Sequence, residues 1–280
     1  MPAEPKLPTF FVIGAPKCAT TSLHLYLDQH PEIEMSSPKE PQVFSAAGYA
    51  TALVRYEEIF RGHASVRGES STLYSQHPRW PGVPERIRAA VAEARFIYLV
   101  RDPLERAVAH WRQHVADGKE ARPLAEALGD PEREDSLYLC PSRYATQLRR
   151  YLESFDRDRI LVLDSVDLRA DPRGTLAAAF RFLKVDPGFS SPRFGERLNR
   201  GEAKGTPSAL GRSLEGRPLE LARRLPMPPG IRRHARRLVT RPIAADPLAP
   251  DLRRRIAAEL HPEVEWLRDF TGKPFSSWSI

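Results

Sequence analysis

Residues 10–44 read FFVIGAPKCATTSLHLYLDQHPEIEMSSPKEPQVF, and this stretch decides the fold class. An apolar, β-branched run ends at Gly14, a short loop carries Lys17, and a segment of helical periodicity begins near Leu23. A strand, a tight loop and a helix N-terminus bring backbone N–H groups and the positive end of a helix dipole around one point. The stretch therefore predicts an α/β protein that binds a phosphate-like ligand at this loop.

The spacing within the loop differs from that of a nucleoside triphosphate loop. A Walker A motif reads G-x-x-x-x-G-K-[ST], whereas here Lys17 follows Gly14 by three residues and no Gly-Lys pair precedes Thr20. A P-loop kinase or NTPase stays open as an alternative, because RILVLD (159–164) could supply a Walker B strand with Asp164 on magnesium. Otherwise Asp164 is predicted to cap the N-terminus of a helix.

Residues 95–114, RFIYLVRDPLERAVAHWRQH, predict a second strand–helix unit. The apolar run from Phe96 ends before Arg101, and Pro103 suits the first turn of an amphipathic helix. Ligands of open α/β sheets bind at the carboxyl ends of the strands. Arg101 therefore lies where a ligand is expected to bind.

GAPKCATTSL, the following HP and KEPQVF resemble the 5′-phosphosulfate segment of sulfotransferases that use 3′-phosphoadenosine 5′-phosphosulfate (PAPS). The likeness is greatest to the bacterial branch related to heparan-sulfate-type enzymes, and it continues to the C-terminus. It implies a P-loop-like, three-layer α/β fold with a central, mostly parallel sheet flanked by helices, in a single domain over residues 1–280. It also implies PAPS as the sulfuryl donor and 3′,5′-adenosine bisphosphate (PAP) as a product.

The resemblance gives roles to the residues of the loop. Lys17 would lie near the bridging oxygen of PAPS and neutralise charge on the departing phosphate. The 5′-phosphate would be held by the Thr20 and Thr21 hydroxyls and by the backbone N–H groups of Cys18, Ala19, Thr20, Thr21 and Ser22. The Cys18 thiol itself is expected to be a small filler. A sulfuryl group carries less charge than a phosphoryl group, so a metal is not needed in principle.

The segment from Arg101 resembles the family's 3′-phosphate segment, R-x-P-x-x-R-A-x-S, which assigns the 3′-phosphate to Arg101. The serine expected as a second ligand falls on Ala109, and the loss of such a hydrogen bond costs on the order of 1.5–3 kcal/mol. The alternative is that Arg101 and Arg106 form a solvated helix start, with Glu105 as the ion-pair partner.

A later segment, LNRGEAKGTPS (198–208), resembles the loop that covers the 3′-phosphate of the adenosine. Lys204 and Gly205 stand in the matching places of this loop. The resemblance therefore adds both residues to the candidate nucleotide site, far along the chain from the first two segments.

Glu40 is the candidate general base, because it matches the glutamate with this role in the heparan-sulfate-type branch. Pro41 predicts an extended backbone at Glu40, in which Lys39 and Glu40 face opposite sides and only the carboxylate enters the cleft. Glu69 is expected at a strand end, where it would either contact the acceptor or brace the following loop. The family often carries a lysine at the next position, where this chain has Ser70.

Composition limits the classes of partner. The net charge is +7, and seven of the 43 basic residues are lysine. The most basic segment, residues 223–242, has little aromatic interleaving, so no nucleic acid is expected as a partner.

No apolar run approaches the ~18 residues of a membrane span, and the N-terminus lacks a secretory pattern, which predicts a cytoplasmic protein. Two cysteines, Cys18 and Cys140, fit a reducing compartment.

The histidines do not predict a metal site. His110 and His114 are one helical turn apart, a spacing that zinc can use, but the sequence offers no obvious third ligand. The two side chains are expected to pack near the nucleotide cleft instead.

The expected elements alternate between strands and helices. Strands are predicted at 9–13, 65–69, 96–100 and 159–163, an extended segment at 39–45, and helices at 20–29, 83–92, 103–117, 122–128, 142–154, 172–183, 216–225 and 249–270. This alternation predicts a parallel sheet with right-handed crossovers.

Together, these patterns favour sulfuryl transfer from PAPS to a hydroxyl of a small-molecule or carbohydrate acceptor, with Glu40 as the base. A non-catalytic nucleotide-binding relative stays open because of Ala109 and Ser70. No pattern specifies the acceptor or the oligomeric state.

Overall fold

The centre of the molecule is a parallel β-sheet. The computed structural model describes residues 7–54, 56–60, 62, 64–196, 205–207, 240–243 and 247–280. The sheet strands are β1 (Phe10–Gly14), β2 (Ile33–Met35), β3 (Val66–Ser70), β4 (Arg95–Val100) and β5 (Ile160–Asp164). They pair in parallel in the order β2-β3-β1-β4-β5, so β1 is the central strand.

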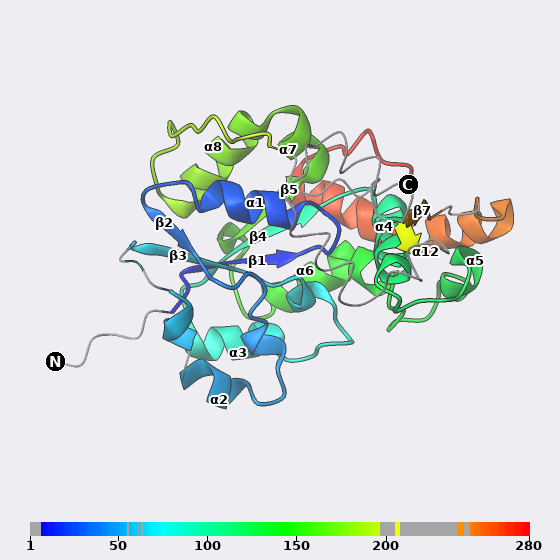
Figure 1. Ribbon diagram of the computed structural model, residues 1–280, viewed down its shortest axis with the longest axis horizontal. Helices are drawn as coiled ribbons and strands as arrows, with labels where there is room; N and C mark the ends of the chain where they lie inside the picture. The colour runs from blue at the N-terminus through cyan, green and yellow to red at the C-terminus, as the bar shows by residue number, and fades with distance from the viewer. Residues whose placement is uncertain are drawn as a thin grey trace.

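Helices cover both faces of this sheet. The α-helices are α1 (Thr20–Leu27), α2 (Tyr49–Val54), α3 (Val83–Ala90), α4 (Pro103–Ala116), α5 (Leu124–Ala127), α6 (Tyr144–Leu152), α7 (Ser165–Ala170), α8 (Pro172–Leu183) and α12 (Pro250–Thr271). Figure 1 shows α1, α7 and α8 on one side of the sheet and α3 and α6 on the other. The three-layer α/β fold that the sequence predicted is therefore confirmed.

The central strand determines where the candidate ligand loop begins. All five residues of β1 are buried, as expected for a parallel strand that is covered on both faces. Gly14 has a φ of 151°, and a Cβ at this position would lie 2.0 Å from the Ser75 Oγ, so a larger residue does not fit. The Ala15 N–H then donates to the Leu99 carbonyl at 2.6 Å. The loop is thus held at the carboxyl edge of the sheet, beside β4.

The predicted element boundaries agree with the structure to within one or two residues for the four strands and for the helices that it describes. The predicted extended segment at 39–45 is wrong at its end, because Val43–Ser45 forms a 3₁₀ helix. The short elements β2, α2 and α7 were not predicted. The helix expected at 216–225 lies outside the described residues.

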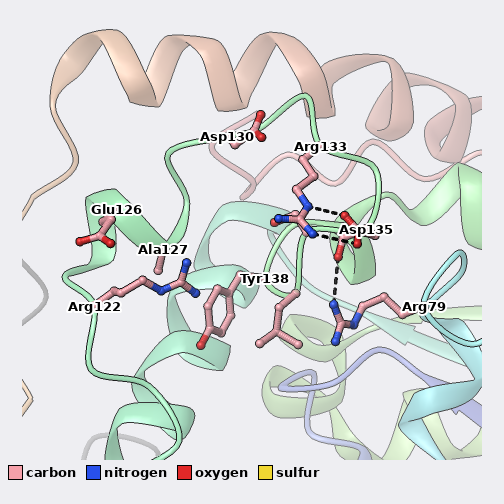
Figure 2. Close-up of a pocket in the computed structure, with 10 residues that line it drawn as sticks. Arg79, Arg122, Glu126, Ala127, Asp130, Arg133, Asp135 and Tyr138 are labelled. Carbon is pink, nitrogen blue, oxygen red and sulfur yellow. Dashed lines mark hydrogen bonds and ion pairs between the residues drawn. The ribbon is translucent and has the colours of Figure 1, made fainter.

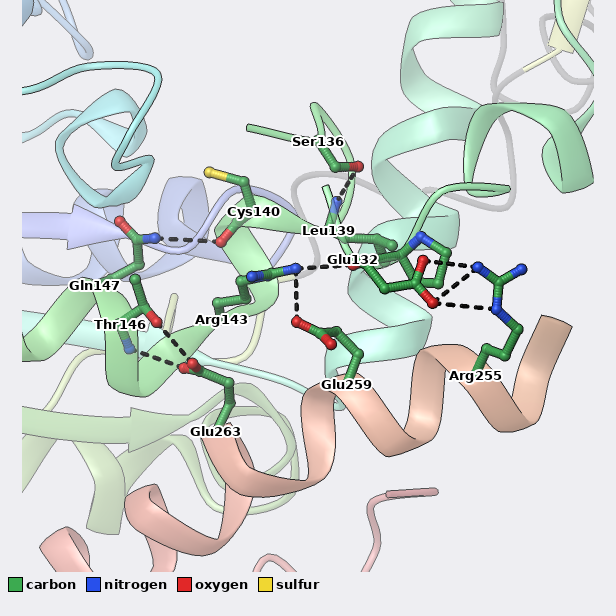
Figure 3. Close-up of polar contacts among 11 residues, drawn as sticks. Glu132, Ser136, Leu139, Cys140, Arg143, Thr146, Gln147, Arg255, Glu259 and Glu263 are labelled. Carbon is green, nitrogen blue, oxygen red and sulfur yellow. Dashed lines mark hydrogen bonds and ion pairs between the residues drawn. The ribbon is translucent and has the colours of Figure 1, made fainter. Parts of the chain in front are cut away.

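The C-terminal helix α12 packs against α6 and α4. Its buried side chains, Ile256, Leu260, Val264 and Leu267, recur at helical spacing. Figure 3 shows that carboxylates on the same helix reach the start of α6: Glu263 accepts hydrogen bonds from the Thr146 N–H at 2.8 Å and the Thr146 hydroxyl at 2.6 Å. In the part of the chain that the structure describes, no helix is long and apolar enough to cross a membrane.

Candidate active site

The loop between β1 and α1 presents the uncapped N-terminus of a helix. Lys17 and Ala19 have positive φ angles of 71° and 65°, and Ala19 precedes α1 without a side chain that caps the helix. The first N–H groups of a helix have no partner within the helix and can bind an anion. Thr20 is buried, whereas Thr21 and Ser22 are half-buried. The structure therefore brings the predicted 5′-phosphate residues together around one helix start.

Helix α4 contacts this loop through a single face. The Lys17 ammonium donates to the Gln113 side-chain carbonyl at 3.0 Å. Arg106, which lies seven residues before Gln113 on α4, donates to the Pro16 carbonyl at 3.5 Å. Residues seven apart lie on the same side of a helix, so both contacts come from the face that looks toward the loop. The candidate catalytic lysine is thus oriented by a helix that is distant in sequence.

Arg106 is fully buried, so the expectation of a solvated helix start is wrong for this residue. Its guanidinium also donates to the Ser142 hydroxyl at 2.6 Å and to the Tyr138 carbonyl. All of these acceptors are uncharged, and burial lowers the pKa of the guanidinium from its usual value. The positive charge therefore stands behind the loop without a carboxylate partner among these contacts, where a bound anion would stabilise it.

Cys18 is a buried filler, as the sequence predicted. Its side chain has no exposed surface, and burial raises the pKa of the thiol to about 12. A thiol with such a pKa stays protonated and is a poor nucleophile at neutral pH. Cys18 can therefore offer the ligand its backbone N–H but not a reactive sulfur.

Arg101 lies at the carboxyl end of β4, on the same edge of the sheet as the loop. Its guanidinium pairs with the Glu105 carboxylate at 2.5 Å, and this ion pair is partly exposed. Arg101 therefore forms the ion pair with Glu105 that the alternative interpretation predicted. Exposed ion pairs contribute about 0–1 kcal/mol, so a phosphate can displace Glu105 at little cost.

The remaining candidates for the 3′-phosphate are only partly described. Ala109 is half-buried on α4. Gly205 begins β6 (Gly205–Pro207), which pairs with β7 (Thr240–Pro242) and lies against α4. Lys204 lies outside the described residues. The structure thus brings Gly205 beside the helix that carries Ala109, although almost a hundred residues separate them in sequence.

The backbone at Glu40 is not extended, so this expectation is wrong. Glu40 has a φ of 60°, in the left-handed region. With this conformation the Lys39 ammonium lies 2.6 Å from the Glu40 carboxylate, on the same side rather than the opposite one. The Glu40 N–H donates to the Ser70 carbonyl at the end of β3, at 3.0 Å. The candidate base thus sits at the strand next to β1, with a cation at its side.

His24 contacts Ser70, the residue whose carbonyl accepts from the Glu40 N–H. The His24 Nδ1 lies 3.0 Å from the Ser70 hydroxyl. Burial, together with the charge of Lys39, lowers the pKa of His24 to about 4, so the ring is neutral at neutral pH. Glu69, the residue before Ser70, has no exposed surface, and burial raises the pKa of its carboxyl to about 7.

These two shifts predict opposite contributions to the pH dependence of stability. Between pH ~4 and 6.5, His24 is protonated in the unfolded state but neutral in the folded state, so the free energy of unfolding rises with pH. Between pH ~4.5 and 7, Glu69 is protonated in the folded state but ionised in the unfolded state, so the free energy of unfolding falls with pH. We expect Glu69→Gln to remove the second contribution. As the pH rises from ~4.5 to 7, the free energy of unfolding of the variant minus that of the parent should increase by about 1.4 kcal/mol per pH unit.

Urea unfolding of both proteins at pH 5, 6 and 7 measures this difference. Every other titrating group contributes equally to the two proteins, so the difference isolates Glu69. Parallel pH profiles would show that Glu69 titrates normally in the folded state.

A pocket of about 230 Å³ lies beside Tyr138 (Figure 2). Its lining includes Arg79, Arg122 and Arg133 and the carboxylates of Glu126, Asp130 and Asp135. Tyr138 connects the pocket to α4, because its hydroxyl lies 3.2 Å from the His114 Nδ1 and its carbonyl accepts from Arg106. The lining is therefore mainly polar, with side chains of both charges.

The structure also places the residues of the alternative predictions. Asp164 ends β5 and accepts from the Val166 N–H at 2.8 Å, so it caps α7 as predicted. His110 packs against His114 and Tyr138. Among the described residues, no group of three or more His, Cys, Asp or Glu side chains could hold a metal ion.

Sequence reasoning missed four residues of this site. They are His24, Lys39, Arg106 and Gln113. The spacing of Arg106, His110 and Gln113 along α4 was a usable signal, because it marks one helical face with several polar groups. No local pattern pointed to Lys39, whose position follows from the left-handed backbone at Glu40.

Comparison with known proteins identifies the family. The sulfotransferase domain family matches residues 7–198. This span is more than half of the chain, so the chain belongs to the sulfotransferase domain family.

Individual relatives agree with this assignment. The chain is 29% identical over 219 residues to the bifunctional heparan sulfate N-deacetylase/N-sulfotransferase 4 of Mus musculus. The matched region covers 71% of this chain and 24% of that protein. The chain is 29% identical over 220 residues to the corresponding human protein 3, with the same coverage. The chain thus spans about a quarter of the length of these relatives. A sulfotransferase from Alicyclobacillus acidocaldarius shares the fold, with a TM-score of 0.68 and 24% identity over 98% of this chain and 99% of the other.

Proposed function

We propose that this sulfotransferase moves the sulfuryl group of PAPS to a hydroxyl of a small-molecule or carbohydrate acceptor, and that PAP is released. One observation carries the proposal: Lys17, the uncapped start of α1 and the buried Arg106 converge on one loop. A nucleotide with two phosphate groups carries negative charge that these cations and backbone N–H groups could bind. Arg101 and the segment at Gly205 are the proposed contacts of the 3′-phosphate.

The proposed chemistry depends on position and charge. In sulfuryl transfer the acceptor oxygen attacks sulfur in line while the bridging oxygen leaves, as in phosphoryl transfer. Lys17 would exchange its contact with Gln113 for the bridging oxygen and neutralise the charge that develops there. Glu40 would accept the proton of the attacking hydroxyl, and Lys39 would hold the carboxylate in place until then.

The polar pocket beside Tyr138 is the proposed place for part of the acceptor. The curated relatives are N-sulfotransferases by name, so an acceptor screen with ³⁵S-labelled PAPS should contain oligosaccharides with free glucosamine amino groups as well as hydroxyl acceptors. A cytoplasmic location and a single domain over residues 1–280 stay predictions.

Calorimetric titration tests the proposed donor. We expect PAP to bind in the micromolar range or tighter without a metal, and ATP with magnesium to bind far more weakly. Tight binding of ATP with magnesium instead would favour the kinase alternative. Binding of PAP without transfer to any acceptor would favour the non-catalytic relative.

Replacing Glu40 by glutamine is expected to lower turnover by roughly 10²–10⁴-fold, the usual contribution of a general base. The affinity for PAP should stay within about twofold, because Glu40 hydrogen-bonds β3 through its backbone and not through its carboxylate. Steady-state kinetics and PAP calorimetry measure the two quantities. A parallel loss of PAP affinity would make Glu40 a structural residue.

A further inference from the structure

The segment that carries Glu40 is held through alternate backbone N–H groups. The Glu40 N–H donates to the Ser70 carbonyl at 3.0 Å. The Gln42 N–H donates to the Ser71 hydroxyl at 3.1 Å, and the Phe44 N–H donates to the Tyr74 hydroxyl at 3.1 Å. All three acceptors lie at the end of β3 or directly after it.

This segment needs such support because its backbone is strained. Glu40 and Gln42 have positive φ angles of 60° and 57°. Residues other than glycine pay roughly 1–3 kcal/mol for such conformations and keep them only where surrounding contacts impose them. The hydrogen bonds to Ser70, Ser71 and Tyr74 are therefore the contacts that support this segment.

Glu69 connects the two hydroxyls that accept these bonds. The Ser71 hydroxyl donates to the Glu69 carboxyl, and the nearby Tyr74 hydroxyl lowers the pKa of this carboxyl. The Ser71 hydroxyl gives its proton to Glu69 and turns its lone pairs toward the Gln42 N–H. Glu69 has no exposed surface, and its second oxygen is buried without a partner in the described structure. It therefore does not contact an acceptor.

We propose that Glu69 is a positioning residue for the candidate base: through the Ser71 and Tyr74 hydroxyls it holds residues 40–44 in the conformation that directs the Glu40 carboxylate into the site. This inference rests on the proposed role of Glu40. It resolves the two interpretations of Glu69 from the sequence in favour of the one in which it braces a loop, and it specifies that loop as the one carrying the base.

Amide hydrogen exchange of the segment tests the proposal without any acceptor. Glu69→Gln introduces a donor beside the two hydroxyls, so exchange at the Gln42 and Phe44 amides should become at least about tenfold faster. Tyr74→Phe should accelerate Phe44 alone, and it also serves if Glu69→Gln fails to fold. Calorimetry should give an unchanged PAP affinity for both variants. Unchanged exchange in both variants would overturn the proposal.

Glu263→Gln is the matched control. Glu263 is likewise a carboxylate that accepts from a hydroxyl and a backbone N–H, but on α12 (Figure 3). This variant should leave exchange at Gln42 and Phe44 unchanged. If it accelerates them equally, the effect of Glu69→Gln is general loosening and the proposal fails.

Turnover of the double mutant separates this proposal from the proposed function. With the acceptor found by the labelled screen, Glu69→Gln should lower kcat, yet have no further effect in a Glu40→Gln background. An equal loss in both backgrounds would overturn the positioning role. If Glu40→Gln alone keeps normal turnover, the base assignment fails, while the exchange measurement still decides whether Glu69 holds the segment.

Discussion

Lys17→Ala is expected to reduce sulfuryl transfer by roughly 10²–10³-fold, the effect of removing one donor that stabilises developing charge. The ammonium is the mobile cation of the loop, and its contact with Gln113 at 3.0 Å keeps it at the carboxyl edge of the sheet. Since the charge on the bridging oxygen grows only during transfer, kcat should fall much more than the affinity for PAP.

Steady-state kinetics with labelled PAPS, together with PAP calorimetry, measure this split. Lys17→Met keeps the length of the side chain without the ammonium and should behave like Lys17→Ala. Lys273→Ala removes a lysine whose ammonium lies 3.3 Å from Asp167 at the surface, and should leave turnover unchanged. Near-normal turnover of Lys17→Met would exclude this lysine from the transition state.

Arg106→Met is expected to cause the largest loss of stability of any single change in the site. It leaves the Ser142 hydroxyl and the Tyr138 and Pro16 carbonyls without their donor in a buried environment. Each buried group without a partner costs about 1–3 kcal/mol, and release of the buried charge offsets part of this. We expect a net loss of roughly 2–5 kcal/mol in the free energy of unfolding.

Thermal unfolding with and without PAP measures both expected roles of Arg106. PAP should raise the Tm of the parent more than that of Arg106→Met, because the variant lacks the charge behind the loop. Arg106→Lys keeps the charge but not the planar fork, so it should recover part of the PAP affinity and little of the stability. The control is Arg255→Met, which breaks an exposed ion pair with Glu132 and should cost less than about 1 kcal/mol. Equal losses in the free energy of unfolding for the two methionine variants would contradict the stabilising role of Arg106.

The strand–loop–helix units could be predicted because their signals are local. The apolar run of β1 ends at Gly14, and Pro103 starts α4. Each of these signals acts within a few residues, so a short window contains it. The family likeness adds the loop chemistry, because Lys17 and its neighbours are contiguous in sequence.

Contacts between distant segments could not be predicted in the same way. Helical periodicity could have shown that Arg106 shares a face with Gln113, but not that this face meets the loop at Pro16 and Lys17. Likewise, Pro41 favours an extended residue before it, yet Glu40 is left-handed because the ends of its segment are bonded to Ser70 and Tyr74. Tertiary hydrogen bonds outweighed the local preference there.

The sequence by itself determined the fold class and the boundaries of the main strands and helices, since apolar periodicity, caps and turn residues act over short distances. Only the tertiary structure decided the strand order, the burial of Arg106 and the left-handed backbone at Glu40. These features depend on which surfaces pack together when the sheet assembles, and on where a buried polar group can find its partner. That information belongs to no single stretch of the chain.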